Sequence, residues 1–126
     1  MKKELIYTSH APAPVGPYSQ AVKAEGAMMF ISGQIALDND GRIVGATIEE
    51  QTIKVIENIQ AILASQGLSL NNVVKTTVLT TDLSKFGKIN EIYNTFFSDS
   101  KPARATYEVS RLPKDVFIEI EAIAVC

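Results

Sequence analysis

The segment TIEEQTIKVIENIQAILASQG, residues 47–67, gives the clearest fold signal in the sequence. Its apolar residues recur at helical spacing, and Thr47 and Glu50 form the T-x-x-E pattern of a capping box, which satisfies free amides at a helix start. Gly67 is well placed to end the helix in the left-handed conformation. The segment therefore predicts an amphipathic helix of about five turns.

A strand and a second helix are expected directly after this helix. The β-branched run NNVVKTTVLTTDL, residues 71–83, favours a strand. The next helix is expected to begin near Asp82 or Ser84, and its apolar residues lie on one face: Phe86, Ile89, Tyr93, Phe96 and Phe97. Asn90 is expected beside that apolar face, one helical step from Phe86 and from Tyr93.

Strands are expected on both sides of this helical part. Residues 3–8 favour a first short strand, and residues 21–37 favour two strands joined by a hairpin turn at Glu25-Gly26. Two further strands, at about 103–110 and 116–125, close the chain. The order β-β-β-α-β-α-β-β predicts an α+β fold, in which a mixed six-stranded sheet carries both helices on one face.

The last predicted strand has two different faces. Ile118, Ile120, Ala122 and Ala124 point one way and are small and apolar enough to lie under the helices. The opposite face mixes Phe, Ile and Val with two carboxylates, Glu119 and Glu121. Because only two helices are available to cover a sheet, this second face is expected to be a subunit interface.

Strand alternation places Arg104 and Thr106 on one side of the strand at 103–110, and small alanines on the other. We expect the alanines to face the helices. If this strand pairs antiparallel with 116–125, Arg104 shares the outer face with Glu119. The register stays open at this point, because a slip of one residue would reverse the faces.

Arg104 and Glu119 on such a face have two interpretations. Composition alone favours a structural ion pair or a pair at the rim of an interface, since structural pairs are the commoner arrangement. Alternatively, the guanidinium binds an anionic ligand, since its planar fork holds a carboxylate through two parallel hydrogen bonds and does not lose its charge. Glu119 would then orient a water or move a proton. Periodicity does not decide between the two.

Composition restricts the class of protein. The chain of 126 residues fits one domain, 1–126, and its 46% hydrophobic and 21% charged residues are ordinary for a globular protein. A net charge of −2 leaves no basic field to recruit phosphates, so nucleic acid is not an expected partner. No window approaches a membrane span and the first apolar run is too short for a signal peptide, so a cytoplasmic protein is expected.

The counts of cysteine and histidine nearly exclude several kinds of catalytic site. Cys126 is the only cysteine and the last residue, and His10 is the only histidine, in a proline-rich loop. Zinc sites and Ser-His-Asp triads each need a histidine with partners. We therefore expect neither a metal nor another cofactor.

The run PARATYEVSRLPKDVFIEIEAIAV, residues 102–125, closely resembles the signature of the RidA (YjgF) family of enamine/imine deaminases. The resemblance extends over nearly the whole chain, through APAPVGPYSQAV, FISGQI, VVKTTVLTTDLSKF and INEIYNTFF. It implies a chorismate-mutase-like fold, a homotrimer and ligand clefts between adjacent subunits. It also implies hydrolysis of 2-imino or 2-enamino acids to 2-keto acids and ammonia, as a 2-iminobutanoate/2-iminopropanoate deaminase.

The resemblance also implies roles for single residues. Arg104 matches the arginine that holds the substrate carboxylate, and Glu119 matches the glutamate associated with the hydrolytic water. The cleft would be lined by five further residues: Tyr18, Ser32, Gly33, Asn90 and Thr106. Thr106 departs from the family, many members of which have cysteine there. Without the resemblance, a structural role would be favoured for Tyr18, Ser32 and Asn90.

Two other functions remain open at this point. The same arginine would serve a regulatory trimer that senses small carboxylates without turnover. An endoribonuclease or translation inhibitor has also been attached to this family, but the acidic pI of about 5.4 and the missing histidine pair argue against an efficient RNA-cleaving site.

Overall fold

Eight helices and strands follow one another in the order predicted from the sequence. The computed structural model describes residues 1–126. Its elements are β1 (Lys2–Ile6), β2 (Ala21–Glu25), β3 (Met28–Gln34), α1 (Ile48–Ala64), β4 (Val73–Thr80), α2 (Phe86–Phe97), β5 (Ala103–Glu108) and β6 (Ile118–Val125). Short 3₁₀ turns precede β4, α2 and β6. None of the helices combines the length and apolar character that a membrane crossing requires.

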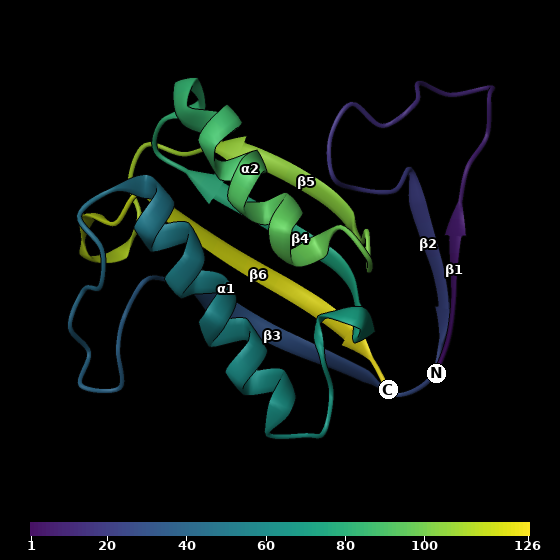
Figure 1. Ribbon diagram of the computed structural model, residues 1–126, viewed down its shortest axis with the longest axis horizontal. Coiled ribbons are helices and arrows are strands. Elements are labelled where there is room, and N and C mark those ends of the chain that lie inside the picture. The colour runs from purple at the N-terminus through teal and green to yellow at the C-terminus, as the bar shows by residue number, and fades with distance from the viewer.

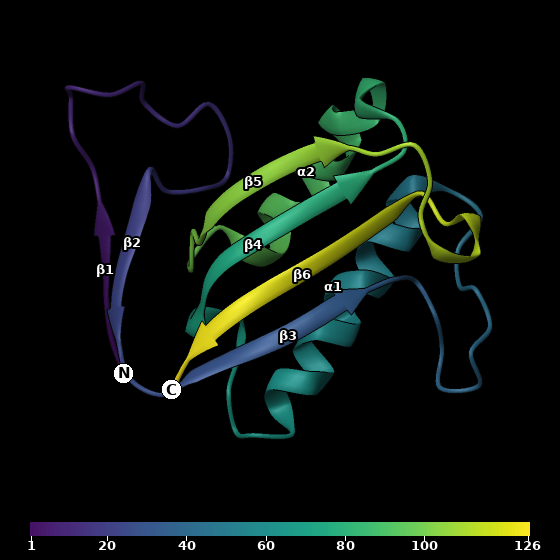
Figure 2. The same cartoon turned by 180° about the vertical axis from the view of Figure 1, so that it is seen from behind.

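Helices α1 and α2 lie side by side on one face of a four-stranded sheet, with strand order β3-β6-β4-β5 (Figure 1). Strand β6 runs antiparallel to both β3 and β4, whereas β5 runs parallel to β4 and forms the edge. The reverse view shows the second face of the sheet without any helix (Figure 2). The predicted mixed sheet with two helices on one face is therefore confirmed.

Strands β1 and β2 form a separate two-stranded sheet, so the expectation of one six-stranded sheet is wrong in this detail. The hairpin expected at Glu25-Gly26 is also wrong, because β2 pairs with β1 while β3 pairs with β6. Gly26 instead carries the chain from one sheet to the other at φ 145°. Only glycine adopts that geometry readily.

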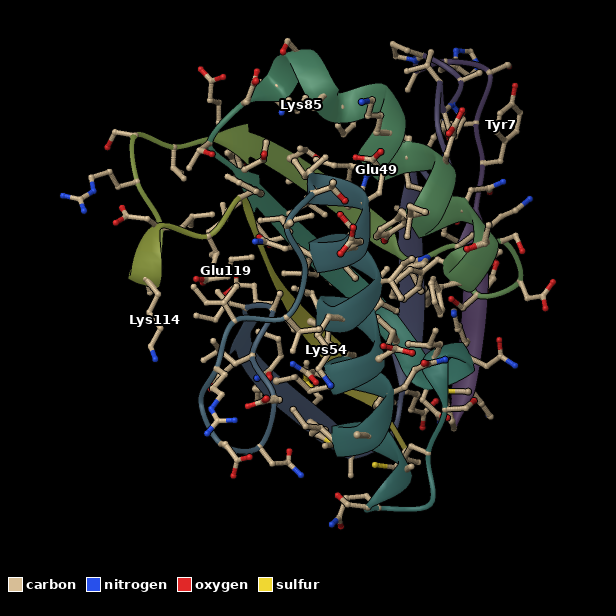
Figure 3. The ribbon with its side chains drawn as sticks, turned by 60° about the vertical axis from the view of Figure 1, so that its left-hand side comes forward. Tyr7, Glu49, Lys54, Lys85, Lys114 and Glu119 are labelled. Atoms are coloured by element: carbon tan, nitrogen blue, oxygen red, sulfur yellow. The ribbon has the colours of Figure 1, made fainter.

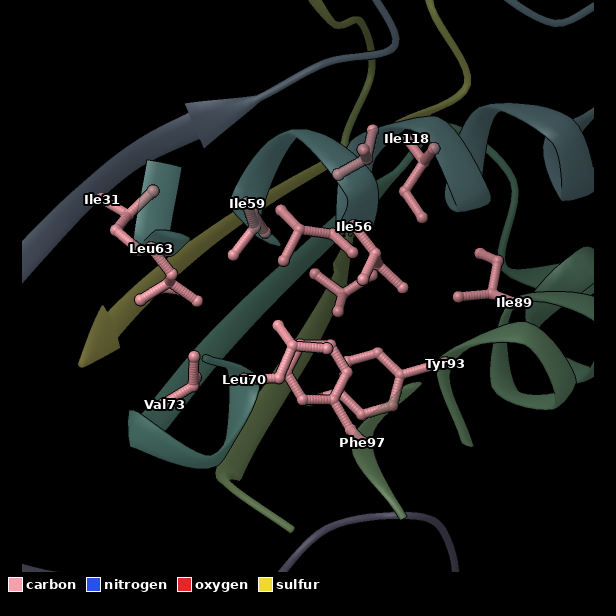
Figure 4. Packing of buried hydrophobic residues seen from close by; sticks show 14 of the residues in the cluster. Ile31, Ile56, Ile59, Leu63, Leu70, Val73, Ile89, Tyr93, Phe97 and Ile118 are labelled. Atoms are coloured by element: carbon pink, nitrogen blue, oxygen red, sulfur yellow. The ribbon is translucent and has the colours of Figure 1, made fainter. Parts of the chain in front are cut away.

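Helix α1 has the ends that its sequence predicts. The Thr47 side chain accepts a hydrogen bond from the Glu50 amide, and Gly67 follows the helix with φ 70°. The buried side of α1 contributes Ile56 and Ile59 to a core that also contains the stacked rings of Tyr93 and Phe97, with centroids 4.4 Å apart (Figure 4). Both predicted helices thus use their apolar faces to cover the sheet.

The two faces of β6 also follow the prediction. The residues under the helices are all buried: Ile118, Ile120, Ala122 and Ala124. On the opposite face, Phe30 of β3 is 71% exposed and Met28 is 58% exposed. Exposed apolar side chains of this size beside the carboxylates of β6 are typical of a surface that contacts another chain, and the interface stays a prediction.

Strand β5 is arranged differently from the prediction. It pairs with β4, not with β6, and Arg104 lies opposite Thr76, which is fully buried under the helices. Thr106 lies opposite Val78, which is buried in the same way. Arg104 and Thr106 therefore face the helices, and the expectation that they share the outer face with Glu119 is wrong. The alanines of β5 take the outer face instead.

Candidate functional site

Arg104 lies in a cage of aromatic rings between β5 and α2. Its Cζ is 4.8 Å from the centre of the Tyr93 ring, 5.1 Å from that of Tyr18 and 5.2 Å from that of Phe86. Its Nη1 donates a 2.7 Å hydrogen bond to Oδ1 of Asn90. Cation–π contacts and this single bond hold the guanidinium in place and leave its other donors for a ligand.

No carboxylate of the same protomer lies within ion-pair distance of Arg104. The two ion pairs within 4.0 Å join Lys88 to Glu49 and Arg111 to Asp115, and all four of these side chains are largely exposed. Burial lowers the pKa of Arg104, while Tyr93 and Tyr18 act in the opposite direction, and the guanidinium stays charged. A half-buried charge without a counterion is costly. An ion pair within the protomer is therefore excluded, and the guanidinium has no anionic partner in its own chain.

A small cavity of about 200 Å³ opens beside the guanidinium. It is lined by Val15, Gly16, Tyr18, Phe86, Asn90, Arg104 and Thr106. Drug-sized ligands occupy about 300–1,000 Å³, so this cavity suits a molecule of only a few heavy atoms.

Thr106 offers two polar groups at this cavity. Its Oγ1 is buried and has no hydrogen-bond partner. Its amide points to the open edge of the sheet, because the Val109 amide donates to the Thr80 carbonyl and alternate residues of a strand point opposite ways. The backbone of Thr106 can therefore donate to a ligand whatever its side chain does.

Glu119 and Gly33 form a second cluster on the other face of the sheet. Strand β3 has a bulge between Ile31 and Gln34, which brings Gly33 against the Glu119 side chain. A Cβ at Gly33 would overlap the Glu119 carboxylate, so no other residue fits there without moving Glu119. Ser32 lies on the same bulge and is exposed. Burial raises the pKa of Glu119, and the neighbouring Glu121 raises it further.

The two clusters do not meet within one protomer. Glu119 lies opposite Leu79 in the register, on the outer face, whereas Arg104 lies opposite Thr76 on the helix face. Figure 3 shows Glu119 on the opposite side of the molecule from Tyr7, which begins the loop that carries Tyr18. The structure therefore brings together Tyr18, Asn90, Arg104 and Thr106, and separately Ser32, Gly33 and Glu119.

Sequence reasoning missed Phe86 and Tyr93 as neighbours of Arg104. Their spacing with Asn90 on one helix face was visible, but it predicted only core packing. The Tyr93 hydroxyl shares a 2.6 Å hydrogen bond with Thr76, and burial raises the pKa of Tyr93 to about 12. Elsewhere, no group of three or more His, Cys, Asp or Glu residues lies close enough to hold a metal ion.

Comparison with known proteins assigns the chain to a family. The profile of the family described as endoribonuclease L-PSP matches residues 8–126. A RutC family protein of Pyrococcus abyssi is 58% identical over 98% of both chains. The mouse 2-iminobutanoate/2-iminopropanoate deaminase is 48% identical over 98% of this chain and 91% of its own. The crystal structure of Escherichia coli TdcF with bound serine is 43% identical, with a TM-score of 0.74 over 98% of both chains.

These relatives align with 98% of this chain, and the family match includes both the arginine cavity and the Glu119 cluster. At such identities over nearly full length, the chain belongs to the endoribonuclease L-PSP family, which is the RidA (YjgF) family that its sequence resembles.

Proposed function

We propose that the protein hydrolyses 2-imino and 2-enamino acids to 2-keto acids and ammonia. The observation that carries this proposal is the uncompensated Arg104 in a cavity of about 200 Å³, which fits a small carboxylate. The deaminase name of the mouse relative, at 48% identity, supports the same substrate class.

Arg104 would hold the substrate carboxylate and thereby fix the position of the imine carbon. Two parallel N–H donors of the guanidinium match the two carboxylate oxygens. Asn90 and the aromatic rings hold the guanidinium, so little freedom is lost when the substrate binds. The free amide of Thr106 adds a donor at the same edge of the cavity.

Glu119 would position the attacking water and accept its proton. Hydrolysis of an imine adds water to the electrophilic carbon and releases ammonia, and both steps move protons. An enamine first needs a proton at carbon, which a carboxyl group of raised pKa supplies near neutral pH. Burial and Glu121 both raise the pKa of Glu119, which favours this double role.

A complete site would form between two subunits of a homotrimer. Arg104 and Glu119 lie on opposite faces of one sheet, so one protomer does not supply both to one substrate. A second copy packed on the exposed Phe30 face would bring its own Arg104 edge toward Glu119. The trimer with clefts between its subunits, as the resemblance implies, meets this requirement.

The pH dependence should report the Glu119 carboxylate. Because the pKa of Glu119 is raised, kcat/KM is expected to fall as the pH drops through that raised value, where the water loses its base. Replacing Glu121 by Gln removes the like charge, lowers the pKa of Glu119 and moves the acid limb to lower pH. Profiles of kcat/KM from about pH 5 to 8 measure this shift. The exposed Glu57→Gln should leave the limb in place.

A coupled assay tests the proposed function directly. A threonine dehydratase releases the unstable imino acid from threonine, and the rate of keto acid release is followed with and without the protein. We expect the protein to accelerate release in proportion to its concentration. Release at the spontaneous rate at every protein concentration would contradict the proposal.

A carboxylate-binding protein without turnover is the second candidate. The structure of TdcF, a relative, holds a bound serine, which is an amino acid and not a product of imine hydrolysis. The arginine cavity would serve such a role equally well. Binding of 2-oxobutanoate without any acceleration in the coupled assay would favour this function.

Ribonuclease activity, which the family description names, has weaker support. A net charge of −2 gives little attraction for a polyanion, and the cavity beside Arg104 is smaller than a nucleotide needs. RNA binding that survives about 200 mM salt would revive it.

A further inference from the structure

One wall of the arginine cavity comes from a loop without helix or strand. Residues 7–20 join β1 to β2, and Figure 1 shows this loop standing beside the β5 edge of the sheet. Val15, Gly16 and Tyr18 of the loop line the cavity. None of the residues from 7 to 20 belongs to the buried core cluster, so core packing does not fix their positions.

The side chain of Gln20 is bonded to the first half of this loop. Its Oε1 accepts a 2.7 Å hydrogen bond from the Thr8 amide. Its Nε2 is close to three carbonyl oxygens, those of Thr8 at 3.0 Å, Pro12 at 2.8 Å and Ala11 at 3.3 Å. A primary amide has an acceptor oxygen and two N–H donors, so one N–H is shared between two of the three carbonyl oxygens.

The second half of the loop is attached to β5 just before Arg104. The Ser19 hydroxyl donates a 2.6 Å hydrogen bond to the Lys101 carbonyl, and the Ser19 amide donates to that of Pro102. Gln20 follows Ser19 directly, so its side chain holds residues 8–12 next to the point where Ser19 is bonded to Lys101 and Pro102. Between these two attachments, Tyr18 lies with its ring 5.1 Å from the Arg104 guanidinium.

We propose that Gln20 is a positioning residue of the carboxylate site, which sets the shape of the loop at residues 7–20 and thereby holds Tyr18 over Arg104. Gln20 does not line the cavity itself, so it acts on the ligand only through the loop. The proposal rests on the proposed function for the identity of the ligand. It assigns to this residue a share of the binding, not of the chemical step.

Two substitutions test this role. Gln20→Ala removes all the side-chain bonds, while Gln20→Glu keeps the shape and the acceptor but presents a carboxylate to three carbonyl oxygens. Both should raise KM in the coupled assay about tenfold or more and leave kcat within about twofold, because binding is lost and the chemical step is not. Gln66→Ala, at an exposed glutamine at the end of α1, is the matched control and should leave KM unchanged.

Two further measurements separate this proposal from the proposed function. The dissociation constant for 2-oxobutanoate, from calorimetry, should rise in both Gln20 variants by the same factor as KM. Chymotrypsin should cut after Tyr18 at least about ten times faster in the variants, with the thermal midpoint little changed, because a loop outside the core opens locally.

Each possible outcome either supports or contradicts the role of Gln20. If the wild type binds 2-oxobutanoate without turnover, the proposed function fails and the ratio of dissociation constants still tests Gln20. Unchanged binding and unchanged cleavage in the Gln20 variants would overturn the positioning role. Wild-type protein that does not bind 2-oxobutanoate would overturn it as well, since the loop would then shape no carboxylate site.

Discussion

Replacing Arg104 by alanine is expected to lower kcat/KM for imine hydrolysis by about 10²- to 10³-fold. Loss of one partner of a desolvated charge pair costs about 2–5 kcal/mol, and each 1.4 kcal/mol is a factor of about ten. The half-buried guanidinium has no carboxylate partner in its own chain, and under the proposed function a substrate carboxylate in the cavity would be its counterion. The coupled dehydratase assay measures the loss.

Arg104→Lys separates charge from geometry. Lysine keeps the positive charge but lacks the planar fork, so most of the loss should remain. Arg111→Ala is the matched control, because Arg111 is an exposed arginine whose partner is Asp115. Full activity in Arg104→Ala would remove the arginine from the site.

The fold of the Arg104→Ala variant should be retained. No carboxylate of the protein is left without a partner by the change, and only Oδ1 of Asn90 loses a donor. The thermal midpoint should therefore move by only a few degrees, because the lost hydrogen bond and cation–π contacts, each worth about 1 kcal/mol, are offset by the removal of a half-buried charge. A collapse of the fold would show that the loss of activity says nothing about the carboxylate.

The local elements of the fold could be predicted because their signals are local. The capping residues of α1, its period and Gly67 all lie within one segment, and the structure has the helix where they place it. The pairing of β5, in contrast, is not determined by a local signal. It depends on which strand α2 returns the chain to, and a parallel pair with β4 satisfies the same alternation as an antiparallel pair with β6.

The prediction of which sheet face carries Arg104 was wrong for a related reason. Small alanines in β5 were expected under the helices, as in β6, but β5 is the edge strand and α2 leaves space beside it. The rings of Phe86 and Tyr93 fill that space together with the guanidinium. The sequence and its family resemblance thus directed attention to Arg104, whose role stays a prediction, while its side of the sheet depended on tertiary packing. The role of Gln20 depends on a loop path that periodicity does not describe.

Mixing two inactive variants is expected to restore activity, because Arg104 and Glu119 face opposite sides of one protomer. Arg104→Ala and Glu119→Gln would each be nearly inactive alone. If the protein is the proposed trimer, subunits mixed at random in equal amounts form an intact cleft when a Glu119→Gln protomer supplies its arginine and an Arg104→Ala neighbour supplies its glutamate. This occurs in about one quarter of the clefts, so about one quarter of wild-type kcat should return.

The double variant distinguishes shared clefts from sites within one chain. An equal mixture of wild-type protein and the double variant Arg104→Ala/Glu119→Gln has half of the wild-type activity before the subunits exchange. Shared clefts predict a fall to about one quarter after exchange, since both contributors must then be wild type, whereas sites within single protomers predict no change. Mixed single variants that stay inactive after exchange, with exchange shown by native mass spectrometry, would place both residues in one protomer's site. That result would require β5 to move, because its present register holds Arg104 under the helices and away from Glu119.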